Sequence, residues 1–263
     1  MSDQETALDV VTIGRSSVDL YGEQVGSRLE DMSGFAKYVG GCPTNIAIGT
    51  AKLGLKSGLI TAVGDEHMGR FIREEVERWG VDTRFLKTDP SRLTSLVILG
   101  IRDQDTFPLI FFREDCADSA LEPADIDEAY IAGAKAVVVT GTHFSRPNLE
   151  AMSRKAAETA RAHGRKVVFD VDYRPVLWGL TGHGLGEERF VESAQTTAHL
   201  QAILPLCVVV VGTEEELHIA GGTTATLDAI RKVRELAPTA LIVCKRGPMG
   251  CVAFAGTIPD DIE

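Results

Sequence analysis

Acidic, amide and basic side chains recur in this sequence directly after short apolar runs or beside paired glycines. The clearest set is Gly40-Gly41-Cys42-Pro43-Thr44-Asn45, which precedes an Ala-rich segment. Paired glycines let a ligand approach the backbone closely, because no side chain intervenes. Thr44 or Asn45 can cap a following helix, whose free N–H groups would point toward the glycines. The pattern predicts a pocket for a polyhydroxylated or anionic ligand, with a tight turn before a helix as the plain alternative.

An arginine at the end of an apolar run could recognise a carboxylate. Arg113 follows Phe112 and precedes Glu114 and Asp115. A guanidinium can hold a carboxylate through two parallel hydrogen bonds, a contact that a neutral sugar would not need. The alternative is a surface ion pair with Glu114 or Asp115, worth at most about 1 kcal/mol.

Aspartates follow two of the predicted strands. Asp19 comes after the first apolar run, and Asp170 and Asp172 follow a later one, with Arg174 close behind. Open α/β sheets bind ligands at these strand ends. The alternatives are a helix or turn cap at Asp19 and a turn stabilised by an Asp170–Arg174 pair.

The elements that must position these residues alternate in type. Short, almost continuous apolar runs predict buried strands of a parallel sheet at residues 10–13, 58–63, 136–140, 167–170, 208–211 and 241–244. Amphipathic segments predict helices at residues 44–53, 68–79, 147–163, 187–204, 213–220 and 226–237. The alternation indicates right-handed βαβ units.

Two regions, 19–38 and 84–113, interrupt this alternation. The second contains two predicted strands, 94–101 and 107–112, on either side of a polar turn at 102–106.

Length and charge limit the classes of function. A chain of 263 residues suits one large α/β domain, and a net charge of −11 argues against a nucleic-acid partner. The longest apolar run, 203–211, contains Pro205 and is too short to cross a membrane, so no membrane partner is expected. Five cysteines without paired metal spacing, and a polar Met1–Thr6 segment unlike a signal peptide, favour a cytoplasmic protein.

Three segments together give the sequence a family resemblance. Residues 14–19, 63–70 and 170–175 resemble the ribokinase-like (PfkB) sugar kinases, and the resemblance extends from about Val10 to Phe254. It implies an α/β fold: a three-layer α/β/α sandwich with a mostly parallel sheet, forming one kinase domain over residues 8–256. It also implies a small β lid, inserted at about 15–39 and 84–116, whose closure would exclude water from the transferring phosphoryl group.

The resemblance also implies a substrate class. Residues 19–21, 40–45 and 112–118 look most like family members that phosphorylate 5-dehydro-2-deoxy-D-gluconate in inositol catabolism. The implied ligands are this acid sugar, ATP and Mg2+, with transfer to a primary hydroxyl. A 2-keto-3-deoxygluconate kinase, a neutral-sugar or nucleoside kinase, and a non-catalytic sugar-binding protein are the alternatives. A homodimer is compatible with the sequence, which does not define the oligomeric state.

Individual roles follow from the resemblance as expectations. The implied substrate-binding residues are Asp19, Gly40, Gly41, Asn45, Phe112, Arg113 and Asp172, and the implied nucleotide-binding residues are Arg174, Thr213, Lys245, Gly247 and Gly250. Glu216 is implied to organise magnesium through water, although acidic residues are also favourable in a first helical turn. Two positions depart from the common family pattern, since Thr213 and Asp172 stand where many members have Asn.

One family motif does not occur in the sequence. The Gly-Ala-Gly-Asp loop, which in the family carries the catalytic aspartate and an anion-binding helix N-terminus, is absent from residues 1–263. We therefore expect a chain truncated before this motif, and the sequence identifies no catalytic residue. Without base and anion hole, phosphoryl transfer is expected to be slower by at least about two orders of magnitude.

Overall fold

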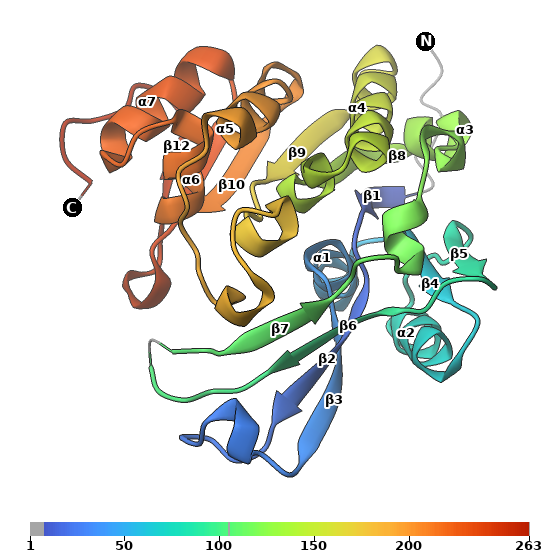
Figure 1. Cartoon of the computed structure of the whole chain (residues 1–263). Helices are drawn as coiled ribbons and strands as arrows, with labels where there is room; N and C mark the ends of the chain where they lie inside the picture. The colour runs from blue at the N-terminus through green and yellow to red at the C-terminus, as the bar shows by residue number, and fades with distance from the viewer. Residues whose placement is uncertain (1–7, 105, 263) are drawn as a thin grey trace.

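A large twisted sheet organises the protein, as Figure 1 shows for this computed structural model. The structure describes residues 8–104 and 106–262, so the Met1–Thr6 segment lies outside the described residues. The sheet has eight strands in the order β12-β11-β10-β9-β8-β1-β4-β5. All neighbours pair in parallel except β12, which is antiparallel to β11. The strands are β1 (Leu8–Ile13), β4 (Ser57–Gly64), β5 (Leu86–Asp89), β8 (Ala134–Thr140), β9 (Lys166–Asp170), β10 (Val209–Thr213), β11 (Leu241–Lys245) and β12 (Cys251–Phe254).

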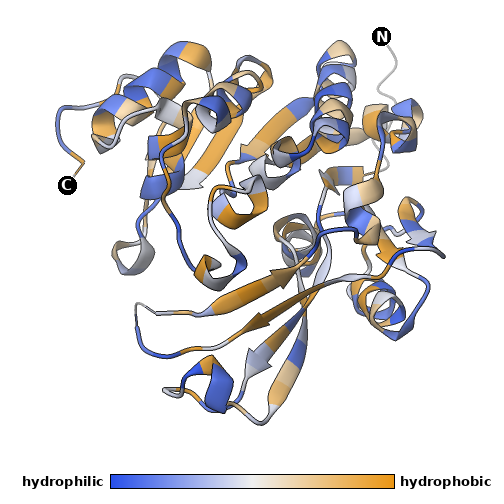
Figure 2. Cartoon of the chain, viewed as in Figure 1, coloured by the Kyte–Doolittle hydropathy of each residue, from blue (hydrophilic) through white to orange (hydrophobic). Residues whose placement is uncertain are grey.

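Helices connect the strands and cover the sheet. They are α1 (Cys42–Lys52), α2 (His67–Arg78), α3 (Glu128–Ala132), α4 (Pro147–Ala162), α5 (Ala194–Gln201), α6 (Glu214–Gly221) and α7 (Thr226–Leu236). Consecutive strand residues point to opposite faces, so Leu59 and Ile60 of β4 enter different layers. Leu59 packs with Ala47 and Ile72 of α1 and α2, while Ile60 belongs to the larger core that includes α4. Figure 2 shows the apolar character of the strands between these layers.

A second, four-stranded sheet projects from the first (Figure 1). Its order is β3-β2-β6-β7, with strands β2 (Ser17–Gly22), β3 (Phe35–Gly40), β6 (Ser95–Leu99) and β7 (Leu109–Phe112). The turn between β6 and β7 is closed by hydrogen bonds such as Arg102 N to Thr106 O. This sheet is the lid that the resemblance predicted, but residues 86–89 form β5 of the large sheet and are not part of it.

The predicted elements agree with the structure except in one long segment. The predicted helix at 187–204 contains only α5, because residues 186–193 form an irregular segment and the helix begins after the Ser193 cap, whose Oγ accepts a hydrogen bond from Thr196 N. The five-residue helix α3 was not predicted because it is too short to show a helical period. The α/β class with a mostly parallel sheet is confirmed.

Candidate active site

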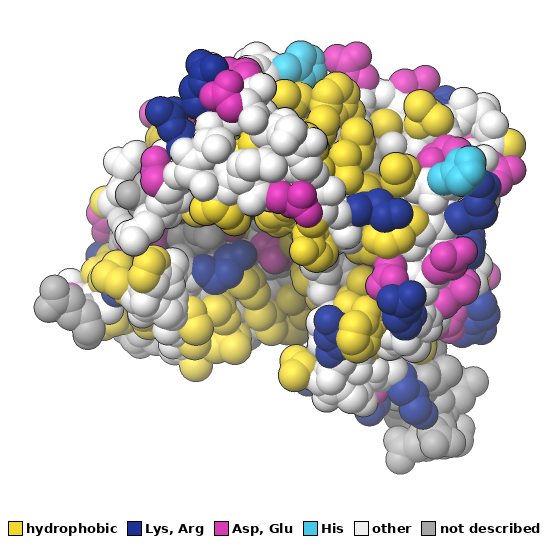
Figure 3. Space-filling view, turned by 90° about the horizontal axis from the view of Figure 1, so that it is seen from below, with side chains coloured by type: hydrophobic (Ala, Val, Ile, Leu, Met, Phe, Trp, Pro, Cys, Tyr) yellow, Lys and Arg dark blue, Asp and Glu magenta, His cyan; other side chains and the backbone are white. Residues whose placement is uncertain are grey.

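A polar pocket of about 450 Å³ lies between the lid and the carboxyl ends of the large sheet's strands. Apolar lid side chains, among them Val97 and Phe111, form one wall, and charged side chains from the large sheet form the other. Figure 3 shows the hollow from below, with charged side chains at its bottom and hydrophobic ones around it. Parallel sheets commonly bind ligands at this position, because their connecting loops meet there.

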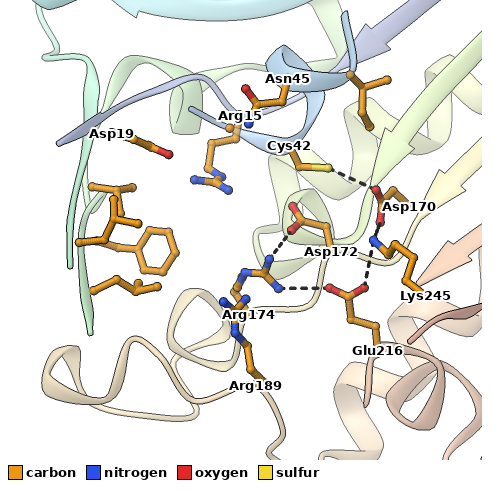
Figure 4. Close-up of a pocket in the computed structure, with 16 residues that line it drawn as sticks. Arg15, Asp19, Cys42, Asn45, Asp170, Asp172, Arg174, Arg189, Glu216 and Lys245 are labelled. Carbon is orange, nitrogen blue, oxygen red and sulfur yellow. Dashed lines mark hydrogen bonds and ion pairs between the residues drawn. The ribbon is translucent and has the colours of Figure 1, made fainter. Parts of the chain in front are cut away.

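Asp19 of β2 lies at the lid end of the pocket (Figure 4). Burial raises the pKa of its carboxyl group, against the opposing effects of a hydrogen bond from Ser17 (2.9 Å) and the charge of Arg15. Gly40 pairs with Ser17 across β2 and β3 and lies diagonally from Asp19, and a Cβ on Gly40 would collide with the Asp19 carboxylate. Gly40 therefore makes room for a protein side chain, and Asp19 keeps hydrogen-bonding capacity for a ligand.

Gly41 ends the lid and begins helix α1. It is the N-cap residue with φ of 95°, and a Cβ there would collide with the carbonyl oxygen of Arg15. The prediction that Thr44 or Asn45 caps this helix is wrong, because the helix already begins at Cys42. Thr44 is buried and donates a hydrogen bond to Arg15 O (3.1 Å), whereas Asn45 lines the pocket.

Asp172 lies deep in the pocket, in an unusual backbone conformation with φ of 32°. Thr142 Oγ1 donates to its Oδ2 (3.1 Å), and Arg174 lies 3.5 Å from its Oδ1. Burial alone would raise the pKa of Asp172, but the positive charges of Arg174 and Arg15 and the Thr142 hydrogen bond lower it below the usual value. Asp172 is therefore ionised and held in place.

Asp170, at the end of β9, faces Cys42 and Lys245. Cys42 Sγ donates to its Oδ2 (3.4 Å) and Lys245 Nζ lies 3.5 Å from its Oδ1. Arg174 pairs with Asp172 and Glu216, so the alternative of an Asp170–Arg174 turn is wrong. The pKa of Asp170 is raised to about 6: burial is the largest cause, the nearby carboxylates of Asp172 and Glu216 add to it, and Lys245 opposes it.

This pKa predicts a pH-dependent effect of Asp170→Asn on stability. A raised pKa means that the folded state holds the proton more tightly, so Asp170 costs stability as the pH rises from about 4 through about 6. The side-chain amide introduced by Asp170→Asn does not ionise, so it does not lose stability as the pH rises. The substitution should therefore stabilise the protein, and the gain in unfolding free energy should be about 1 kcal/mol larger at pH 7.5 than at pH 5. Urea unfolding at both pH values measures it.

Asp82→Asn is the matched control for this measurement. Asp82 is partly buried, but hydrogen bonds from Arg84 outweigh its desolvation and lower its pKa. It is therefore ionised at both pH values, and the effect of its substitution should not change between them. An effect of Asp170→Asn that is equally constant would contradict the raised pKa.

Thr213 and Glu216 form a capping box at the start of α6. Glu216 N donates to Thr213 Oγ1 (3.2 Å), and Thr213 N donates to Glu216 Oε2 (2.8 Å). The other Glu216 oxygen pairs with Arg174 at 3.1 Å, and Lys245 lies 3.7 Å from Oε2. Thr213 and Glu216 thus stabilise the first turn of α6, and the Glu216 side chain also lines the pocket.

Gly247 and Gly250 lie in the β11–β12 turn. Both have positive φ, 55° and 86°, and both are exposed. They do not line the pocket, although Lys245 at the end of β11 does.

Arg113 and Phe112 do not line this pocket but a second one, which shares Phe111 with it, and their role in binding substrate stays a prediction. Arg113 follows the last residue of β7, where the chain leaves the lid, and its side chain is only 3% exposed. Its Nε donates to Asp118 at 2.7 Å, so its charge is already neutralised by a buried carboxylate. The alternative of a surface pair with Glu114 or Asp115 is wrong, because Asp115 pairs with Arg92 and Glu114 with His183.

The structure adds pocket residues that the sequence did not identify, among them Arg15, Cys42, Phe111 and Arg189. Strand alternation could have indicated Phe111, because β7 can turn either Phe111 or Phe112 toward the pocket but not both. Arg15 follows β1 by two residues, a position comparable to that of Asp172 after β9. Arg189 comes from the irregular segment that was predicted to be helical.

A parallel sheet with this pocket and a β lid defines a ribokinase-like sugar kinase. The family model described as pfkB family carbohydrate kinase matches residues 7–258, and the chain belongs to this family. It is 35% identical to 5-dehydro-2-deoxygluconokinase of Geobacillus kaustophilus, over 97% of this chain and 74% of the relative. It is 34% identical to the protein of the same name from Bacillus subtilis, over 96% of this chain and 75% of the relative.

Solved structures agree with the fold. A PfkB protein from Polaromonas superposes with a TM-score of 0.79 at 28% identity, covering 95% of this chain and 83% of that one. An uncharacterized sugar kinase from Pyrococcus horikoshii, solved in complex with ATP, gives a TM-score of 0.77 at 25% identity, covering 95% and 76%. Among the described residues, no helix is both long and apolar enough to cross a membrane.

Proposed function

We propose that this carbohydrate kinase transfers the γ-phosphoryl group of ATP to a primary hydroxyl of an acid sugar, with 5-dehydro-2-deoxy-D-gluconate as the substrate. One observation carries the proposal: a single pocket joins a hydroxyl-binding end, at Asp19 and Asn45, to a cationic end, at Arg174, Arg189 and Lys245. The first suits a sugar and the second suits phosphates. The names of the relatives support the choice of sugar.

Within this proposal, three polar side chains bind the sugar. Asp19 accepts hydrogen bonds from sugar hydroxyls, and Asn45 can both donate and accept. Asp172 is ionised, fixed by Thr142 and Arg174, and lies between the two ends of the pocket. The lid wall, with Phe111, covers the apolar face of the ligand and excludes water, which limits hydrolysis of ATP.

The cationic end would hold the phosphates. The charges of Arg174 and Lys245 are balanced by the carboxylates of Asp172, Glu216 and Asp170, whereas Arg189 forms no ion pair among the described residues. We assign the neighbouring Thr213, Gly247 and Gly250 to the nucleotide side by family resemblance.

The carboxylates fit magnesium through water rather than by direct ligation. No group of three potential ligands is close enough to hold a metal among the described residues. Mg2+ keeps most of its water shell, so Asp170 and Glu216 can bind those waters. When bound with ATP, the ion neutralises phosphate charge.

The remaining inferences concern the whole chain. We treat residues 8–256 as one kinase domain with the lid inserted in it, and Ile258 still packs into its core. A cytoplasmic location and a homodimer stay predictions.

Calorimetry and ADP release test the proposal together. We expect saturable binding of 5-dehydro-2-deoxy-D-gluconate and of Mg-ATP, with much weaker binding of D-fructose and adenosine. ADP release that depends on the acid sugar would support transfer. Binding without ADP release would support the sugar site and contradict transfer by this chain. Tighter binding of a neutral sugar or nucleoside would overturn the acid-sugar assignment.

A further inference from the structure

Arg15 is a buried arginine that makes no ion pair with any described carboxylate. The residue is only 6% exposed, and its Nε has no hydrogen-bond partner within the described part of the chain. No described acidic side chain lies within salt-bridge distance of it, whereas Arg113 and Arg174 each have such a partner. A buried charge of this kind is unfavourable unless an opposite charge reaches it.

The pocket is the direction from which that charge can come. Figure 4 shows the guanidinium of Arg15 pointing into the cavity between Asp19 and Asp172. The guanidinium lies 5.5 Å from the ring centroid of Phe111, which supports one face. Its backbone is fixed as well, because Thr44 donates to Arg15 O and Gly41 packs against the same carbonyl group. The side chain is therefore held in position before any ligand binds.

The surrounding carboxylates act on Arg15 only from a distance: its charge helps to lower the pKa of Asp172 and opposes the rise in the pKa of Asp19, but neither makes an ion pair with it among the described residues. Asp172 already interacts with Arg174 and Thr142, and Asp118 with Arg113. Asp19 is not in ion-pair contact with Arg15, although both face the same pocket. His143, which is also buried, is neutral because burial and the nearby arginines lower its pKa to about 3, so it does not add to the positive charge of Arg15.

We propose that Arg15 binds the carboxylate of the acid-sugar substrate and thereby selects acid sugars over neutral ones. This inference rests on the proposed function and moves the role predicted for Arg113 to a different residue. A guanidinium offers two parallel N–H groups that match a carboxylate. The phosphates of ATP have their own cations at the other end of the pocket, in Arg174, Arg189 and Lys245.

The test compares two ligands that differ only in charge: 5-dehydro-2-deoxy-D-gluconate and its neutral C1 amide. Calorimetry should show that Arg15→Met weakens binding of the acid by at least about 30-fold and changes binding of the amide by less than about threefold. Arg15→Lys should give an intermediate loss for the acid, because lysine keeps the charge but not the paired donors. Thermal melting should show that Arg15→Met is folded, since no internal ion pair is lost.

Arg189→Met is the matched control, because Arg189 also lines the pocket without an ion pair among the described residues. It should weaken Mg-ATP and leave the ratio of acid to amide affinity unchanged. If the wild type prefers the acid and Arg15→Met keeps that preference, the role of Arg15 is refuted while the proposed function stands. If the wild type itself does not prefer the acid, the acid-sugar function fails.

Discussion

Replacing Asp118 with alanine is expected to lower the free energy of unfolding by about 3–5 kcal/mol, because it leaves the buried Arg113 charge without a partner. The pair is almost completely removed from solvent, with side-chain exposures of 3% for Arg113 and 0% for Asp118, and the two side chains are 2.7 Å apart. One further nitrogen, Arg113 Nη2, is buried without a hydrogen bond among the described residues. Urea unfolding monitored by circular dichroism measures the loss.

Two further variants separate this effect from a general loss of surface charge. Asp115 lies three residues before Asp118 and is the exposed partner of Arg92. Asp115→Ala should therefore lower the free energy of unfolding by less than about 1 kcal/mol. The double variant Arg113→Met, Asp118→Ala should recover most of the loss, since a buried ion pair replaced by apolar side chains is often neutral in stability. If Asp118→Ala is as mild as Asp115→Ala, Arg113 does not depend on Asp118, and a role for it in binding a ligand anion regains support.

The sequence predicted the fold well because its strands are buried on both faces and therefore appear as unbroken apolar runs. Runs such as 136–140 and 167–170 correspond to β8 and β9 within two residues. The failures occurred where packing against distant segments decides the structure. Residues 187–193 have a polar composition that suits a helix, yet here they cross the pocket rim and contribute Arg189.

The sequence predicted those site residues that follow strands, and it failed where distant segments decide the contacts of a side chain. Asp19, Asp172 and Arg174 follow strands, and strand ends of a parallel sheet converge on one pocket, so local sequence was sufficient. The ion-pair partner of Arg113 could not be predicted from the sequence, because it is set by three-dimensional packing and Asp118 lies in a short 3-10 helix at 117–120 that no periodicity reveals. Arg15 was not identified as a site residue, because the sequence alone does not show whether an arginine has a carboxylate partner in the folded protein.

Asp19→Ala is expected to weaken sugar binding by at least about 100-fold. A carboxylate that accepts two hydroxyl hydrogen bonds contributes roughly 1.5–3 kcal/mol for each, and alanine makes neither. The loss should not reflect unfolding, because burial raises the pKa of Asp19 and its charge therefore costs folding stability. Calorimetry with 5-dehydro-2-deoxy-D-gluconate measures the affinity, and Mg-ATP binding should change by less than about threefold.

The geometry around Asp19 offers an independent test that leaves the carboxylate in the protein. Gly40→Ala adds a methyl group where the Asp19 side chain lies, so the carboxylate must leave its present position. We expect this substitution to weaken the sugar by at least about tenfold and to cost about 1–3 kcal/mol of stability through overpacking. Gly49→Ala in helix α1 meets no neighbour and should stabilise the helix by about 1 kcal/mol without affecting the sugar. If Gly40→Ala and Asp19→Ala both leave sugar affinity unchanged, the hydroxyl-binding end of the pocket lies elsewhere and the orientation proposed for the substrate must be reversed.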